Sequence, residues 1–63
     1  MPTTLRSERK GNDEIRLIQD TDYYLEMLRD DVVLTHQEVA EASHPEMALE
    51  YYESLLPVWL NAR

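Results

Sequence analysis

The sequence predicts an all-α fold, either a small helical hairpin or a three-helix arrangement, that is completed by homo-oligomerisation. First, apolar residues recur at helical spacing over residues 13–31. Second, two helix-start signals follow, at Thr35 and at Ser43. Third, the segment from Tyr51 to Leu60 carries apolar residues on nearly all faces of a helix. One neighbouring helix leaves part of that segment uncovered, so a second copy of the chain is the simplest cover.

The first predicted helix spans about residues 13–31. Ile18, Leu25 and Val32 are spaced by seven, and other apolar side chains flank them. Asp13 suits the start of a helix because its carboxylate accepts a backbone N–H and favours the positive end of the helix dipole. Residues 1–12 lack periodicity and are expected to form a flexible basic leader. The chain therefore divides into this leader and a single helical domain, 13–63.

A short second helix is predicted over residues 36–42. Thr35 and Glu38 have the spacing of a capping box, which implies a break in the chain just before Thr35. The preceding segment 32–34, Val-Val-Leu, prefers β geometry, but a single short strand has no partner, so it either continues the first helix or forms a buried connector. If the capping box is overridden, the first helix runs on to Ala42.

The last predicted helix spans residues 45–61. Pro45 is tolerated in a first helical turn, and Ser43 precedes Glu46 at capping-box spacing. Pro57 lacks the N–H that would pair with the carbonyl of Glu53, so it is expected to kink or interrupt this helix.

Size and composition favour association. A chain of 63 residues forms one domain and buries too little surface to be very stable alone, and with no cysteine it has no disulfide to compensate. Tyrosine and tryptophan are favoured as interface anchors, and the C-terminal apolar segment has faces to spare. The predicted self-interface or partner interface consists of Tyr23, Tyr52, Leu56, Trp59 and Leu60.

Charge and motif content exclude several functions. The formal net charge is −7, and the segment from Asp13 onward repels phosphate backbones, so no direct nucleic-acid binding is expected. Residues 35–43 resemble the first half of a helix-turn-helix, but the following helix presents glutamates where such motifs carry arginine or lysine. His36 and His44 are separated by a predicted helix break and are not expected to bind metal. With a single glycine and no nucleophile elbow, the sequence predicts no enzyme and no cofactor.

No apolar run approaches the roughly 18 residues that a membrane-spanning helix needs, and residues 1–10 lack the apolar core of a secretory signal. We expect no membrane association and a cytoplasmic location. In length, acidity and helix pattern the chain resembles the small early-region accessory proteins of lambdoid bacteriophages. That resemblance implies a protein that redirects host machinery by binding it.

The predicted function is therefore a small acidic protein–protein interaction module, homodimeric or of higher order, that binds and modulates a host or regulatory protein. Two alternatives remain open at this point. One is a nucleic-acid mimic whose carboxylates occupy a nucleic-acid-binding enzyme. The other is a transcriptional regulator of the helix-turn-helix type.

Overall fold

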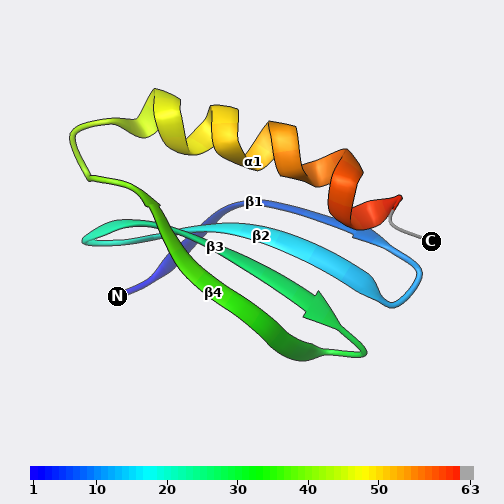
Figure 1. Ribbon diagram of the computed structural model, residues 1–63. Coiled ribbons are helices and arrows are strands. Elements are labelled where there is room, and N and C mark those ends of the chain that lie inside the picture. Colours follow the sequence, from blue (N-terminus) through cyan, green and yellow to red (C-terminus); the bar gives the residue numbers. More distant parts are fainter. Residues whose placement is uncertain (62–63) are drawn as a thin grey trace.

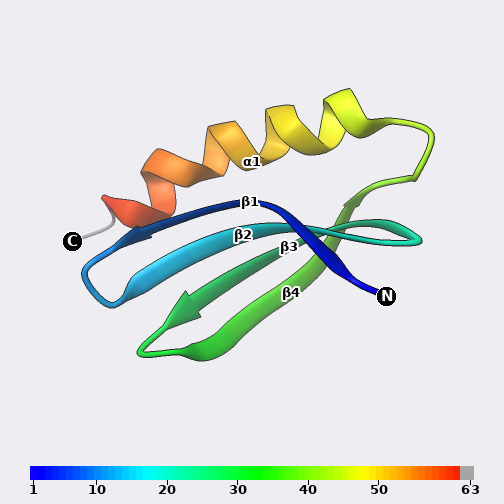
Figure 2. The same cartoon turned by 180° about the vertical axis from the view of Figure 1, so that it is seen from behind.

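A computed structural model describes residues 1–61 and shows a four-stranded antiparallel sheet covered on one face by one helix (Figures 1 and 2). The strands follow one another in space as they do in the chain. The predicted all-α fold is wrong. The elements are β1 (Thr3–Lys10), β2 (Asp13–Asp20), β3 (Asp22–Arg29), β4 (Val32–Ala40) and α1 (Pro45–Leu60).

Tight turns join the strands, and each contains a residue with positive φ. Gly11 has a φ of 63° in the two-residue connection from β1 to β2, and Thr21 has a φ of 68° between β2 and β3. Asp30 and Asp31 have φ values of 53° and 64° in the connection from β3 to β4. Two consecutive residues with positive φ are what a type I′ hairpin turn requires. The chain therefore reverses three times within residues 10–32.

The predicted helix over 13–31 is instead the hairpin β2–β3. Ile15 and Leu17 lie on either side of Arg16 and face α1, and Leu17 is the cross-strand partner of Leu25. The spacing of seven between Ile18 and Leu25 was misleading, because Ile18 pairs with Tyr24 on the opposite face of the sheet. The turn at Thr21 resets the alternation between the two strands.

Two further predicted elements are corrected by the edge strands. The predicted leader, residues 1–12, contains β1, which pairs with β2 along its length. The predicted helix 36–42 is replaced by β4 and the turn that follows it, so Thr35 and Glu38 do not form a capping box. The β-forming segment 32–34 does have a partner strand, β3, which also removes the helix-turn-helix over residues 35–43.

The C-terminal helix is confirmed, as α1. Its N-cap is His44, without a side-chain hydrogen bond, and Pro45 occupies the first turn. Pro57 lies inside α1 and does not end it. The backbone N–H of Asn61 donates to the carbonyl of Pro57 at 3.0 Å, which closes the last turn.

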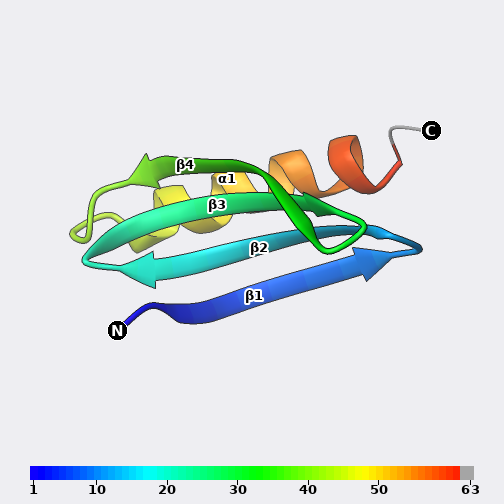
Figure 3. The ribbon, with the colours of Figure 1, turned by 90° about the horizontal axis from the view of Figure 1, so that it is seen from below.

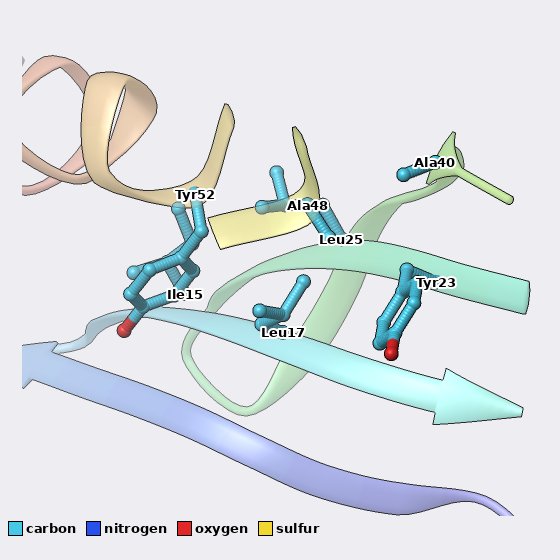
Figure 4. Packing of buried hydrophobic residues seen from close by; sticks show 7 residues of the cluster. All are labelled: Ile15, Leu17, Tyr23, Leu25, Ala40, Ala48 and Tyr52. Atoms are coloured by element: carbon cyan, nitrogen blue, oxygen red, sulfur yellow. The ribbon is translucent and has the colours of Figure 1, made fainter. Parts of the chain in front are cut away.

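The core lies between the sheet and α1 (Figure 4). Ile15, Leu17 and Leu25 are fully buried on the two central strands, and Ala48 is 0% exposed on the helix. A small residue at position 48 lets the helix backbone approach the sheet closely. The complete buried cluster contains Ile15, Leu17, Tyr23, Leu25, Ala40, Ala48 and Tyr52.

The apolar C-terminal segment is largely covered by its own sheet. Tyr52 is 3% exposed, and further residues of α1 pack against the same core: Leu49, Leu55, Leu56, Trp59 and Leu60. A sheet covers a wider sector of a helix than a second helix does, so this segment does not by itself require a second copy. The large apolar side chains of α1 that stay exposed are Met47, Tyr51 and Val58.

Candidate functional site

The face of the sheet that α1 does not cover is the most distinctive surface of the protein; Figure 3 looks onto it. We call it the open face. Because side chains alternate across a strand, its members are the neighbours of the core residues on the two central strands. They are Glu14, Arg16 and Ile18 on β2 and Tyr24, Glu26 and Leu28 on β3. On β4 their cross-strand partners include His36 and Glu38.

Two buried apolar side chains, Ile18 and Leu28, lie on the open face among its polar residues. Ile18 is 9% exposed and Leu28 is 3% exposed, yet neither belongs to the cluster between the sheet and α1. Polar side chains with long aliphatic stems stand between them on the same face, and such stems cover apolar surface. The open face is thus well packed and not a loose polar surface.

A ladder of ion pairs crosses the open face from β1 to β4. Arg9 Nη1 lies 3.8 Å from Glu14 Oε1, and Arg16 Nε donates to the other carboxylate oxygen of Glu14. Arg16 Nη1 in turn lies 3.8 Å from Glu26 Oε1. His36 Nδ1 is 2.9 Å from Glu26 Oε2, which completes the ladder on β4.

In this ladder the guanidinium groups of Arg9 and Arg16 are paired with carboxylates of the same face. The side chains of Glu14 and Glu26 are only 14% and 16% exposed, so these pairs are shielded better than most surface ion pairs. Arg9 also reaches Asp31 Oδ1 at 3.3 Å. The arginine charges are therefore balanced within the sheet.

An aromatic pair lies at the β4 end of this ladder and includes its last member, His36. The rings of Tyr24 and His36 stack with centroids 4.9 Å apart and an interplanar angle of 15°. Their strands place them diagonally, because Tyr24 pairs with Glu38 whereas His36 pairs with Glu26. Because the rings are stacked, each covers one face of the other, and only their outer faces and edges are left for a ligand.

Carboxylates surround the Tyr24 end of the platform. Partial burial raises the pKa of the Tyr24 hydroxyl above its ordinary value, and the negative charges of Glu38, Asp22 and Asp20 raise it further. Asp22 also accepts the backbone N–H of Ala42 at 3.1 Å, which ties the β2–β3 turn to the chain after β4. We call Tyr24, His36, Asp20, Asp22 and Glu38 the acidic platform.

The residues predicted for an interface lie elsewhere, on the other side of the sheet. Tyr23 and Tyr52 are 7% and 3% exposed and belong to the core, so a single chain already covers them. Leu56, Trp59 and Leu60 are half-buried against the same core. That these five residues contact a partner stays a prediction.

Trp59 has defined roles within the chain. Its indole Nε1–H donates to the backbone carbonyl of Glu14 at 3.0 Å. The guanidinium carbon of Arg29 lies 4.8 Å from the centroid of its ring, and Arg29 Nε also donates to Asp13 Oδ1 at 2.9 Å. These contacts fasten the end of α1 to β2 and β3.

Sequence reasoning missed the acidic platform. It placed Tyr24 on a helical core face and interpreted His36 and Glu38 as the start of a helix. The signal that was present is the alternation of polar and apolar residues from Glu14 to Leu17, which is typical of a strand with two different faces.

Among residues 1–61, no group of three or more histidine, aspartate or glutamate side chains is arranged to hold a metal ion. One hollow of about 370 Å³ lies beside the β1–β2 turn and is lined in part by Gly11 and Leu60. Within the described chain, α1 is too short and too polar to cross a bilayer.

Comparison with family models, with curated proteins and with solved structures gave no match to this chain.

Proposed function

We propose that the protein is a protein-binding module that holds a basic segment of a host or regulatory protein on its open face, at the acidic platform. The observation that carries the proposal is the stacked pair of Tyr24 and His36, which stands among carboxylates and not in the core. The charge of −7 supplies a field that draws a basic partner toward the protein.

Aromatic faces and carboxylates together suit the side chains of arginine and lysine. A guanidinium group stacks on an aromatic ring and forms bidentate hydrogen bonds with a carboxylate, and an ammonium group gains from the same ring face. Glu38 is exposed and lies opposite Tyr24 on the neighbouring strand, so one cation can contact both side chains.

The shape of the open face favours a macromolecular partner over a small ligand. Small-molecule sites are concave and bury most of the ligand surface, whereas this face is the surface of a four-stranded sheet. Its ion-pair ladder alternates acids with arginines, which is a poor imitation of the uniform negative charge of a nucleic-acid backbone. A basic peptide segment can contact both the aromatic pair and the carboxylates.

Fluorescence anisotropy with a labelled tetra-arginine peptide tests this proposal. We expect binding that weakens as the salt concentration rises from about 50 to about 300 mM, because the screening length then shortens by roughly 2.4-fold. Tyr24→Ala and Glu38→Gln should each weaken binding by roughly three- to tenfold, which corresponds to one cation–π contact or one charge-assisted hydrogen bond.

The matched control is Glu53→Gln, which removes the same charge from an exposed position on α1. A tetra-glutamate peptide serves as the negative probe. If Glu53→Gln weakens binding as much as Glu38→Gln, the attraction comes from net charge alone and the acidic platform is not the site.

A further inference from the structure

The two edges of the sheet differ in how they meet solvent. An edge strand leaves backbone N–H and C=O groups unpaired, and charged residues discourage another strand from adding to it. The edge strand β1 carries Arg6, Glu8, Arg9 and Lys10, whereas the edge strand β4 carries Glu38 as its one carboxylate. At the start of β4 three apolar residues are exposed: Val32 by 57%, Val33 by 46% and Leu34 by 53%.

The helix adds apolar surface beside β4. Met47, Tyr51 and Val58 are exposed, and their spacing of four and seven places them on one line along α1. Gln37 Nε2 donates to the Tyr51 hydroxyl at 3.3 Å, which fixes the middle of this line against β4. Met47 shares a hollow with Val39 and Ala40 near the end of the strand. The second half of β4 and the first half of α1 therefore adjoin each other, at Gln37 with Tyr51 and at Val39 with Met47.

We propose that β4 pairs antiparallel with β4 of a second copy of this chain, about a twofold axis that passes through Gln37. The pairing would join two sheets into one of eight strands, twice the four of a single chain, with both helices on the same face. The two copies of Tyr51, each in contact with its own Gln37, would then lie near the axis on that face. This proposal does not depend on the binding of a basic segment.

The register follows from the irregularities of β4. Its pairing with β3 shifts between Met27 and Leu28 and again between Tyr23 and Tyr24, so the regular part is 35–38. In an antiparallel pair, residues directly opposite each other point to the same face of the sheet. If both helices lie on one face, the twofold axis must therefore pass between two copies of the same residue and not between two neighbouring positions. The central candidates are His36 and Gln37.

Charge complementarity selects Gln37. An axis at His36 would put the two histidines opposite each other and Glu38 opposite a leucine. An axis at Gln37 puts each His36 opposite Glu38 of the second copy, twice per dimer. Both residues lie on the open face, where His36 pairs with Glu26 and Glu38 with Tyr24 within each chain. A histidine directly across from a carboxylate can form a hydrogen-bonded pair, which becomes an ion pair when the imidazole is protonated, whereas two histidines opposite each other repel when both are protonated.

Disulfide cross-linking tests the register, because the chain has no cysteine of its own. In the proposed dimer the Cα atoms of the two copies of residue 37 are about 4.5–5.5 Å apart, which a disulfide bridges. The two copies of residue 35 are offset by four residues, or about 13 Å along the strand, which is too far. Under mild oxidation we expect Gln37→Cys to form a covalent dimer, and Thr35→Cys, also on β4, to form no covalent cross-link.

Ser7→Cys, on the opposite edge strand β1, is a second control. Cross-linking of Gln37→Cys no faster than of Thr35→Cys or Ser7→Cys would overturn the proposed pairing. Sedimentation velocity measures the oligomeric state without any introduced cysteine. A protein concentration of about 100 µM lies well above the Kd expected for a weak dimer. We expect a dimer for the native chain and for Glu53→Lys and a monomer for Glu38→Lys; a native chain that is monomeric, or a Glu38→Lys variant that is fully dimeric, contradicts the proposal.

Discussion

Truncation of Leu25 to alanine should remove roughly a third or more of the stability of the fold. Leu25 is 0% exposed, lies on the central strand β3 and is the cross-strand partner of Leu17 beneath the helix. Removing a fully buried leucine costs the transfer free energy of the lost methyl and methylene groups plus that of the cavity left behind, about 3 kcal/mol in total. A domain of 63 residues has a free energy of unfolding of roughly 3–9 kcal/mol at typical values per residue.

Urea unfolding, followed by far-ultraviolet circular dichroism and extrapolated linearly, measures this loss. The matched control is Val58→Ala, which truncates an apolar side chain that is 63% exposed on α1 and should cost less than about 0.5 kcal/mol. A loss below about 1 kcal/mol for Leu25→Ala, or equal losses for the two variants, would refute the placement of the core between β2, β3 and α1.

Three further predictions concern single side chains. The Tyr52 hydroxyl is buried without a hydrogen-bond partner among the described residues, so Tyr52→Phe should raise the free energy of unfolding by roughly 1 kcal/mol in thermal or urea unfolding. Burial raises the pKa of the Tyr52 hydroxyl, and Glu8 raises it further against the lowering effect of Arg6. The folded state therefore keeps this proton at a pH where the unfolded state has lost it, so this contribution to stability should be complete below the ordinary tyrosine pKa of about 10 and fall as the pH rises above it. The fall should be smaller in Tyr52→Phe. Thr21 is a β-branched residue at a φ of 68°, so Thr21→Asn should stabilise the β2–β3 turn by roughly 1 kcal/mol and raise the melting temperature, and a lower melting temperature would contradict the strain. Trp59→Phe loses the 3.0 Å hydrogen bond to the carbonyl of Glu14 and should cost about 1–2 kcal/mol in urea unfolding, whereas an unchanged midpoint would show that this contact is not formed in solution.

The helix was predictable because its signals are local. Pro45 and the apolar spacing that follows fix α1 without reference to the rest of the chain. The hairpins also had local signals, since Gly11-Asn12 is a common hairpin turn and Val32-Val33 favours a strand. They were outweighed by the spacing of seven between Ile18 and Leu25, which a hairpin produces as readily as a helix when its turn shifts the alternation.

The acidic platform was not predictable from local signals. The stacking of Tyr24 on His36 depends on the register between β3 and β4, and that register depends on two bulges in β4. The sequence also suggested self-association for a reason that the fold removes, because the sheet covers most of the segment from Tyr51 to Leu60. The proposed dimer rests instead on the edge of β4 and the exposed line along α1.

Chemical-shift mapping is the most direct test of the proposal that the open face binds a basic segment. Tetra-arginine peptide titrated into isotopically labelled protein should shift the backbone amide signals of Tyr24, His36 and Glu38 and saturate. The amides of Glu50 and Glu53, which are exposed acids on α1, should move little. Shifts that spread equally over α1 and the sheet, or that concentrate on α1, would contradict the assignment of the open face as the binding surface.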